Sequence, residues 1–238
     1  VKMICDWAAR RNLLPRVEVL GFVDGHTSVD WIHATGCRVI NLLCKGSLKH
    51  CTCQLRKTPE EHIEDIIGVV NYANEQDMEV NIYLEDWSNG MKDSPEYVFQ
   101  MVDALMHTNI KRYMLPDTLG VLNPLQVIEY MRKMVKRYPH AHFDFHPHND
   151  YDLAVSNVLA AVLSGAKGLH TTINGLAHVV DGQTRGTRAG QGLHLDTRLA
   201  RHAGRNQYMK ANLPVRARRR PALGHVLSRR PRRSDGRN

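Results

Sequence analysis

Two histidines separated by one residue, His146 and His148, are the side chains of this sequence best placed to do chemistry. They follow residues 141–145, whose alternating pattern is typical of a strand. Residues i and i+2 of a strand share a face about 6 to 7 Å apart, so both imidazoles can reach one metal ion from the same side. The spacing is equally typical of two surface histidines at a strand end, and Pro147 weighs slightly against an interior strand.

The elements that must position these histidines alternate along most of the chain. Six β-rich stretches are interleaved with helical patterns, which indicates parallel strands joined by crossover helices. The expected strands are residues 16–23, 38–43, 79–84, 111–115, 141–145 and 168–173. The expected helices are residues 1–14, 29–35, 58–76, 94–107, 123–138 and 151–164. A doubly wound sheet and a barrel both satisfy this alternation.

The positions of the polar motifs favour a barrel. Glu85, Thr118 and the histidine pair each come just after an expected strand, so they gather at one end of the sheet. That end is the active-site face of a TIM (β/α)8 barrel, although a doubly wound sheet also binds ligands at the carboxyl ends of its strands. We therefore expect an α/β fold, a partial TIM barrel of about six βα units in residues 1–176.

The charge of the chain is unevenly distributed. The formal net charge is +8, yet residues 177–238 hold 15 basic and three acidic side chains, and residues 1–176 hold 17 basic and 21 acidic ones. The arginine clusters of the tail have no apolar periodicity and cannot bury a core, so we expect residues 177–238 to be disordered or frameshifted. The competing hypothesis is a non-catalytic chain whose basic tail binds nucleic acid, and we favour it less.

Several classes of protein are disfavoured by the sequence. There is no run of 18 or more apolar residues and no secretory signal, so a membrane partner is not expected. The five cysteines have no disulfide-framework spacing, which predicts a cytoplasmic protein. Within a polar loop expected to run to Lys57, Cys51 and Cys53 lie beside His50, but Cys-x-Cys with one histidine is not a structural zinc spacing.

Four motifs together resemble the metal-dependent barrel family of 2-isopropylmalate, homocitrate and citramalate synthases, with which hydroxymethylglutaryl-CoA lyase shares its fold. In this order they are highly specific, and the resemblance covers residues 1–176. The motifs are Tyr-Leu-Glu-Asp at 83–86, Leu-Pro-Asp-Thr-Leu-Gly at 115–120, Phe-His-Pro-His-Asn-Asp-Tyr-Asp-Leu at 145–153 and Thr-Thr-Ile-Asn-Gly-Leu at 171–176. Residues 19–25, 41–48 and 85–90 look most similar to the citramalate synthase branch.

The resemblance implies an acyltransferase of branched-chain amino-acid biosynthesis that condenses acetyl-CoA with a 2-oxo acid, pyruvate giving citramalate. A 2-isopropylmalate synthase, which uses 2-oxoisovalerate, and a homocitrate synthase are the alternatives. The family uses a divalent ion (Mg²⁺, Mn²⁺ or Zn²⁺) to chelate the oxo acid and polarise its carbonyl, and the intact protein is expected to be a homodimer.

The resemblance also implies roles for individual residues. His146 and His148 match the family's metal-binding histidines, and Thr118 matches a threonine that hydrogen-bonds the substrate carboxylate, the alternative being a threonine that caps a turn. Glu85 should point into the barrel beside Tyr83, either as a catalytic carboxylate or as one half of a structural ion pair.

Three further residues, Leu20, Leu43 and Tyr83, match positions that line the pocket for the side chain of the oxo acid. They would leave room for little more than a methyl group, which favours pyruvate, although ordinary packing of a barrel interior would need the same residue types.

The chain departs from the family at both ends. The family's first strand, which supplies a metal-binding Asp and a catalytic Arg, would lie before Val1. The family's Gly-Glu-Arg-Ala-Gly-Asn segment is replaced after Leu176 by Ala-His-Val-Val. We therefore expect a fragment that is itself inactive and derives from an active synthase.

Overall fold

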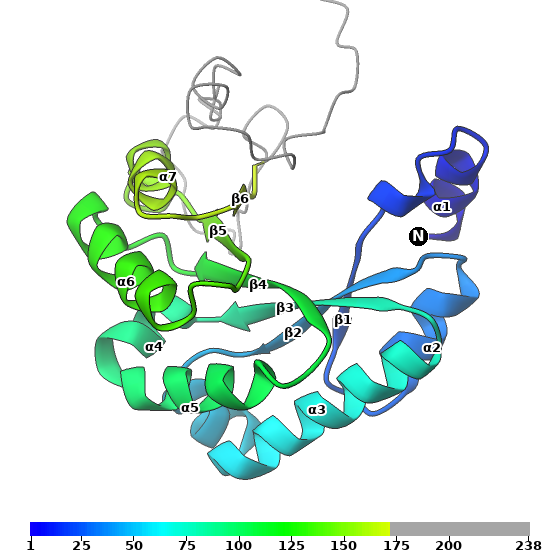
Figure 1. Cartoon of the computed structure of the whole chain (residues 1–238), viewed down its shortest axis with the longest axis horizontal. Coiled ribbons are helices and arrows are strands. Elements are labelled where there is room, and N and C mark those ends of the chain that lie inside the picture. The colour runs from blue at the N-terminus through cyan, green and yellow to red at the C-terminus, as the bar shows by residue number, and fades with distance from the viewer. Residues whose placement is uncertain (172–238) are drawn as a thin grey trace, which may run out of the picture.

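The computed structural model describes residues 1–171, which form one curved parallel sheet wrapped by helices (Figure 1). The strands pair in chain order, and every pairing is parallel. They are β1 Val19–Phe22, β2 Val39–Lys45, β3 Glu79–Glu85, β4 Ile110–Asp117, β5 Phe143–Pro147 and β6 Gly168–Leu169. A doubly wound sheet would reverse its strand order and carry helices on both faces, whereas a barrel does neither. The predicted partial barrel is therefore confirmed.

The helices between successive strands lie on the outer side of the curved sheet, and α1 lies at the edge that β1 forms (Figure 1). Their bounds are α1 Lys2–Ala9, α2 Thr27–Ala34, α3 Pro59–Glu75, α4 Trp87–Asp93, α5 Pro95–Leu105, α6 Pro124–Arg137 and α7 Ala154–Leu163. None of the helices within residues 1–171 has the length and apolar character needed to cross a bilayer.

Local signals set the helix starts. Thr58 and Glu61 form the capping box expected from their spacing, with the Glu61 N–H donating to Thr58 Oγ1 at 3.2 Å and the Thr58 N–H donating to Glu61 Oε2 at 2.8 Å. Asn123 and Gln126 form a second capping box at the start of α6. Both helices carry proline at their first position, where a missing N–H costs nothing.

Three expectations about local structure were wrong or incomplete. The expected helix 1–14 is shorter, and Pro15 lies instead in a separate 3₁₀ turn, η1 Leu14–Arg16. The expected polar loop contains a π-helical turn, η2 His50–Leu55, whose Cys51 is buried and donates to the carbonyl of Lys57. Helix α4 was not anticipated. The predicted tail, residues 177–238, and the boundary at residue 176 lie outside the described residues.

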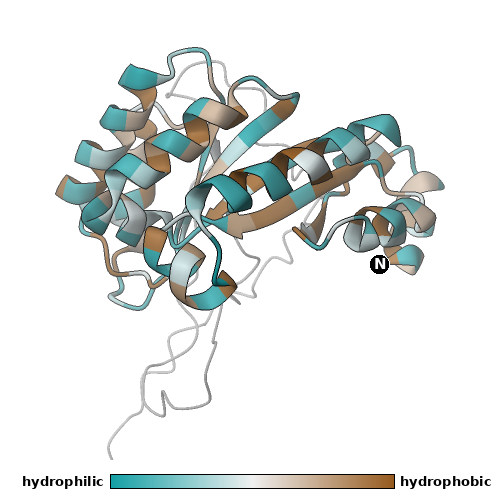
Figure 2. Cartoon of the chain, turned by 90° about the horizontal axis from the view of Figure 1, so that it is seen from below, coloured by the Kyte–Doolittle hydropathy of each residue, from teal (hydrophilic) through white to brown (hydrophobic). Residues whose placement is uncertain are grey.

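The sheet has an apolar outer face and a more polar inner face. Along β2, Ile40, Leu42 and Cys44 are buried in the hydrophobic core, while Asn41, Leu43 and Lys45 are only partly buried. Figure 2 shows largely hydrophobic strands beneath helices whose outward surfaces are largely hydrophilic. The core therefore fills the layer between sheet and helices, and the alternate residues are left for the barrel interior.

A close contact between two glycines fixes the loops at the carboxyl ends of β2 and β3. A Cβ on Gly90 of α4 would lie 2.0 Å from the carbonyl oxygen of Gly46, and one on Gly46 would lie 2.5 Å from the carbonyl oxygen of Leu84. The backbone itself occupies this space, so no side chain can turn aside to make room. Only glycine allows the two loops to approach this closely.

Replacing Gly90 by alanine should therefore destabilise the fold by about 1–3 kcal/mol, the usual cost of overpacking. Gly68→Ala is the matched control, because a Cβ at this exposed position of α3 meets nothing within 4 Å. It should stabilise the protein by about 0.5–1 kcal/mol through helix propensity. Urea unfolding of both variants measures this, and an unchanged midpoint for Gly90→Ala would contradict the contact.

Candidate functional site

His146 and His148 lie close together at the carboxyl end of β5. His146 Nε2 and His148 Nε2 are 3.3 Å apart. The backbone N–H of His148 donates to the carbonyl of Asp117 at 3.2 Å, which ties the residue to the end of β4. Both side chains are partly exposed on the inner face of the sheet. Strand alternation and the hydrogen bond to the end of β4 together place both imidazoles at the carboxyl edge of the sheet.

The spacing of these nitrogens fits one metal ion. Two imidazole nitrogens at about 2.0–2.1 Å from a common ion, with an angle between the octahedral and the tetrahedral value, are about 2.8–3.4 Å apart. Within residues 1–171, no group of three or more His, Cys, Asp or Glu side chains is arranged to hold a metal. A catalytic zinc site has three protein ligands, so a metal ion at the histidine pair would need at least one further ligand.

A third imidazole, His170, lies beside the pair and was not anticipated. It follows β6, and its Nδ1 is 3.1 Å from His146 Nδ1. The hydroxyl of Tyr83 lies 2.5 Å from His170 Nδ1 and 3.4 Å from His146 Nδ1. The three rings meet edge to face at centroid separations of 5.2–5.5 Å. Tyr83 and the two histidines therefore form one packed polar cluster.

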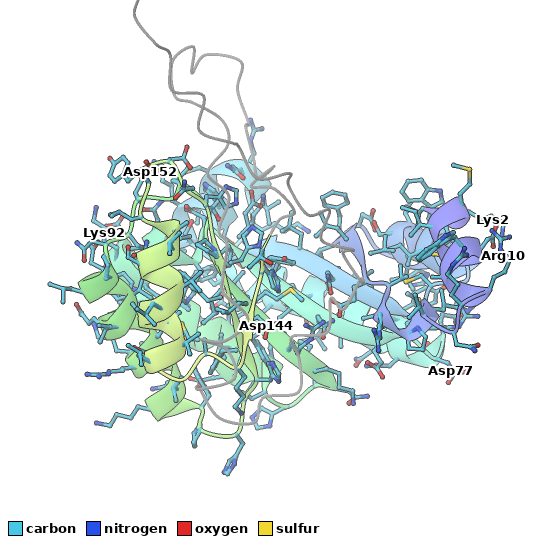
Figure 3. All side chains as sticks on the ribbon, turned by 90° about the horizontal axis from the view of Figure 1, so that it is seen from above. Lys2, Arg10, Asp77, Lys92, Asp144 and Asp152 are labelled. Atoms are coloured by element: carbon cyan, nitrogen blue, oxygen red, sulfur yellow. The ribbon has the colours of Figure 1, made fainter. Side chains whose placement is uncertain are left out.

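Asp144, labelled in Figure 3, contacts His170 of this cluster and is only 1% exposed. Its Oδ2 accepts from Arg112 Nη1 at 2.9 Å and lies 3.4 Å from His170 Nε2. Its Oδ1 lies 2.9 Å from His142 Nε2. Burial opposes ionisation, but the contacts with His142 and His170 outweigh it and hold the pKa of Asp144 well below its usual range. The site thus rests on a buried, ionised carboxylate.

Arg112 extends these contacts across the floor of the barrel interior. It forms an ion pair with Glu18, which precedes β1, and its Nε donates to Asn81 Oδ1 at 3.3 Å. Asn81 in turn donates to Asn41 Oδ1 at 3.0 Å. A continuous layer of polar side chains therefore runs across the sheet from the start of β1 to β5.

Glu85 faces the interior at the end of β3, as predicted, and forms an ion pair with Lys45. The two residues are direct cross-strand neighbours in the β2–β3 register, and their side chains are 26% and 19% exposed. Lys45 was not anticipated as the partner. The sequence left two interpretations of Glu85 open, a catalytic carboxylate and one half of a structural ion pair. The ion pair is present, and the catalytic role stays a prediction.

Thr118 lies just beyond β4 and is partly buried. Its Oγ1 accepts from the backbone N–H of Asp86 at 2.8 Å, so the hydroxyl proton remains available for a further acceptor. Asp86 has a left-handed backbone with φ of 66° and is fixed by Ser47 and Asn89, each donating to its carboxylate at 2.7 Å. The threonine is therefore held by a rigid turn between β3 and α4.

The turn that carries Thr118 packs against the loop that carries His148. Gly120 has φ of +60°, and a Cβ there would lie 2.6 Å from the Asp150 backbone nitrogen and 2.9 Å from the carbonyl carbon of His148. Asp117 is fully buried and accepts from the Leu122 N–H at 2.9 Å. Two of the sequence motifs are thus held in direct contact at the carboxyl edge.

The three residues predicted to line a substrate pocket are only partly brought together. Leu43 and Tyr83 are direct neighbours in the β2–β3 register. Leu20 pairs with Asn41 instead and is 48% exposed at the β1 edge. The Tyr83 ring could line one side of a substrate pocket, while its hydroxyl contacts His146 and His170. Burial raises the pKa of Tyr83, which keeps that hydroxyl protonated.

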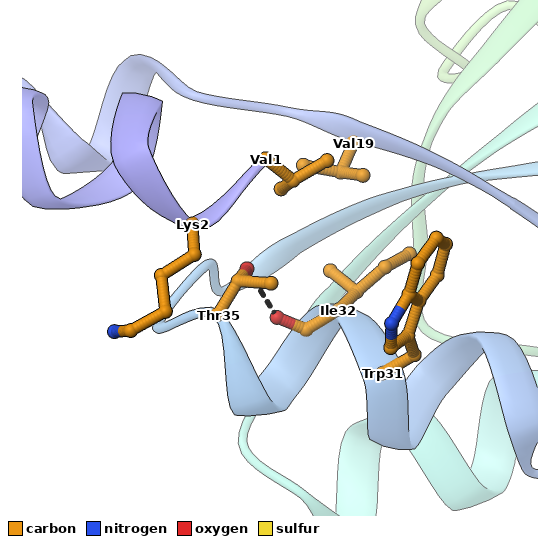
Figure 4. Close-up of a pocket in the computed structure, with 6 residues that line it drawn as sticks. All are labelled: Val1, Lys2, Val19, Trp31, Ile32 and Thr35. Atoms are coloured by element: carbon orange, nitrogen blue, oxygen red, sulfur yellow. Dashed lines mark hydrogen bonds between the residues drawn. The ribbon is translucent and has the colours of Figure 1, made fainter.

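A separate cavity of about 230 Å³ lies between α1, β1 and α2 (Figure 4). Its lining includes Val1, Val19, Trp31 and Ile32, and Thr35 Oγ1 is occupied in a 2.7 Å hydrogen bond to the Ile32 carbonyl. The cavity is mainly apolar and includes none of the predicted site residues. We assign it to the packing of α1 and not to the candidate site.

His62 supports the site from the helix side. It is buried in α3, and its Nε2 accepts from the backbone N–H of Lys45 at 3.1 Å. Burial lowers the pKa of His62 to about 4, so the imidazole is neutral at pH 7. This hydrogen bond fixes the last residue of β2, which carries the ammonium group opposite Glu85.

A family model described as HMGL-like matches residues 11–192 of the chain. Curated proteins similar to it include the (R)-citramalate synthase of Aquifex aeolicus, 35% identical over 138 residues and matched over 58% of this chain and 26% of that protein. The homocitrate synthase of Sulfolobus acidocaldarius is 33% identical over 55% of this chain and 27% of that protein. The chain thus spans about a quarter of the length of these relatives.

Solved structures with the same fold include the hydroxymethylglutaryl-CoA lyase of Pseudomonas aeruginosa, with a TM-score of 0.60 at 17% identity over 72% of this chain and 62% of that one. The HMG-CoA lyase of Brucella melitensis has a TM-score of 0.57 at 17% identity over 72% of this chain and 65% of that one. At these identities the likeness supports the barrel fold alone.

The role of His62 predicts a pH dependence of stability. The unfolded imidazole titrates near pH 6.5 and the folded one near 4, so the unfolded state binds more protons between these values. The stabilising contribution of neutral His62 should be fully present above pH 6.5. The free energy of unfolding should fall by about 3 kcal/mol at most on acidification to pH 4. His62→Gln keeps an acceptor for Lys45 and should flatten this slope in urea titrations. The exposed control His140→Gln should retain it, and equal slopes for wild type and His62→Gln would contradict the account.

Proposed function

This chain belongs to the HMGL-like family, and from that premise we propose that it forms part of an acyltransferase that condenses acetyl-CoA with a 2-oxo acid. The observation that carries the proposal is the 3.3 Å separation of His146 Nε2 and His148 Nε2 at the carboxyl edge of the sheet. The names of the similar curated proteins, citramalate, homocitrate and 2-isopropylmalate synthases, support this reaction class.

His146 and His148 would hold a divalent ion, Mg²⁺, Mn²⁺ or Zn²⁺, through their Nε2 atoms. Bound there, the ion would supply Lewis-acid polarisation of the oxo acid's carbonyl. The residues of the chain do the remaining work. The imidazoles must be neutral to offer a lone pair, and the edge-to-face packing against Tyr83 and His170 fixes the ring plane of His146.

Thr118 would bind and orient the carboxylate of the oxo acid. Its oxygen already accepts from the Asp86 N–H, so its own proton is free to donate to the substrate. Glu85 would hold or release a proton at its carboxylate during the condensation. Lys45 contacts its Oε2 and would fix the position of the group.

We propose pyruvate as the oxo acid, with citramalate as the product. Leu43 beside Tyr83 supports this choice, because a leucine and a tyrosine ring on neighbouring strands in direct register would leave room for little more than the substrate's methyl group. A branched acid such as 2-oxoisovalerate adds two methyl groups, which must displace packed side chains. Hydrophobic pockets discriminate by about 10–200-fold on such differences.

Metal binding by the chain itself is the first test. Zn²⁺ titrated into the protein and followed by calorimetry should bind at a site that His146→Ala and His148→Ala each weaken at least about tenfold, because each removes a ligand. The exposed His140→Ala is the matched control and should change nothing. Wild-type affinity in both ligand variants would refute the assignment.

Substrate choice can be tested by grafting. The matching segment of the 2-isopropylmalate synthase of Sulfolobus acidocaldarius, 30% identical over 162 residues, is replaced by that of this chain. Release of CoA should then favour pyruvate over 2-oxoisovalerate by about 10–100-fold in kcat/KM. Leu43→Ala in the graft should shift the preference toward the branched acid, and the exposed Leu125→Ala should not.

If the graft does not fold by circular dichroism, Leu20, Leu43 and Tyr83 are placed individually at the matching positions of the same synthase. A graft that keeps its preference for 2-oxoisovalerate would place this chain in the 2-isopropylmalate branch.

A further inference from the structure

Two of the five cysteines, Cys5 and Cys37, meet at the junction between the first helix and the sheet. Cys5 lies on α1, and Cys37 lies two residues before the start of β2. Cys5 is 2% exposed and Cys37 is fully buried, and both are free thiols. This junction is at the amino-terminal end of β2, whereas the candidate metal site lies at the carboxyl edge of the sheet.

The contacts of the two sulfur atoms bring them together. Cys5 Sγ lies 3.6 Å from Thr35 Oγ1. Gly36, with φ of +88°, turns the chain directly after Thr35 and so directs Cys37 back toward α1. The Cys37 thiol donates to the Val17 carbonyl at 3.2 Å and is also a side-chain hydrogen-bond partner of the Cys5 thiol. Both residues belong to the same hydrophobic cluster.

The other cysteines have different surroundings. Cys44 donates to the Tyr83 carbonyl at 3.1 Å, Cys51 donates to the Lys57 carbonyl at 3.4 Å, and Cys53 is exposed. A disulfide requires two sulfur atoms that can approach to about 2.05 Å without a large movement of the backbone. The contact between their thiols makes Cys5 and Cys37 the pair suited to such a bond.

We propose that Cys5 and Cys37 form a redox-modification site, at which a small-molecule disulfide oxidises both thiols to one intramolecular disulfide that holds α1 on the sheet. One cysteine thiolate attacks the small disulfide, which forms a mixed disulfide and releases one thiol. The other cysteine thiolate then attacks the protein sulfur of that mixed disulfide and releases the second thiol. The two cysteines lose two electrons and two protons, and the small disulfide gains them. The site is independent of the proposed condensation.

Helix α1 controls access to both thiols. Two of its eight residues, Cys5 and Ala8, are buried, whereas Met3 and Ile4 are 84% and 61% exposed. A helix that buries so little opens locally at a lower free energy than the core of the protein. Burial also raises the pKa of Cys37, which keeps this thiol unreactive while α1 is in place. Oxidation therefore begins when α1 separates from the sheet and is completed when it returns.

The disulfide would change how firmly α1 is attached. It would close the loop between residues 5 and 37, which holds η1, β1 and α2, and such cross-links stabilise a fold mainly by restricting the unfolded chain. Val1 and Lys2, at the start of α1, line the apolar cavity of Figure 4 together with Thr35, which contacts Cys5. The bond would therefore also keep this cavity covered.

The test is oxidation of the full chain carrying Cys53→Ser, which removes the exposed thiol and prevents disulfides between molecules. Glutathione disulfide is added with and without urea, at a concentration of urea below the unfolding midpoint. We expect the loss of two of the four remaining thiols, faster in urea because α1 opens more often. Tryptic peptides 3–10 and 17–38 each contain one cysteine, so mass spectrometry without reductant should find these two peptides joined.

The oxidised chain should unfold at a Tm about 5–15 °C above that of the reduced chain, and a thiol reductant should reverse the shift. Cys51→Ala removes a buried thiol outside the pair and is the matched control, which should still form the link, whereas Cys5→Ser and Cys37→Ser should not. Four thiols retained after treatment in urea, peptides joined in another combination, cysteines left as mixed disulfides, or a lowered Tm would each overturn the proposal. The peptide map is read with both cysteines in place, so it holds even if a serine variant fails to fold.

Discussion

A single buried carboxylate, Asp144, determines how the inner face of this sheet is organised. An ionised group in a protein interior costs several kcal/mol unless charged and hydrogen-bonding partners surround it. Here Arg112, His142 and His170 converge on it from the ends of three strands, and Arg112 also reaches Glu18 at the opposite edge. Through Arg112, the carboxylate is linked to Glu18, which lies 126 residues earlier in the sequence. The polar cluster of Tyr83, His146 and His170 depends on this anchor.

The division between structure and chemistry follows from strand alternation. In each long strand one set of residues packs under the helices and forms the core, and the other set faces the interior, where no helix can cover it. Parallel pairing then brings the carboxyl ends together, so His146 lies opposite Pro116 and Glu85 opposite Lys45. The candidate site is therefore assembled by register, and each strand contributes one or two side chains.

The fold and the histidine pair could be predicted from sequence because their signals are local. A capping box at Thr58, alternation in the strands and the spacing of His146 and His148 all fall within a few residues. The partners of the site could not be predicted in this way. Lys45 and His170 meet Glu85 and His146 only through the register of neighbouring strands, which no short pattern encodes. A reading of alternation through Gly168 would have placed His170 on the inner face, but it would not have identified its contacts.

The central claim is that His146 and His148 present their Nε2 atoms to one divalent ion. The most direct measurement is an anomalous difference map at the zinc edge from crystals of the chain grown with Zn²⁺. The account predicts a peak about 2.0–2.1 Å from both Nε2 atoms, on the edge of the His146 ring away from Tyr83. Zinc bound elsewhere in the crystal with no peak between these two nitrogens would contradict it.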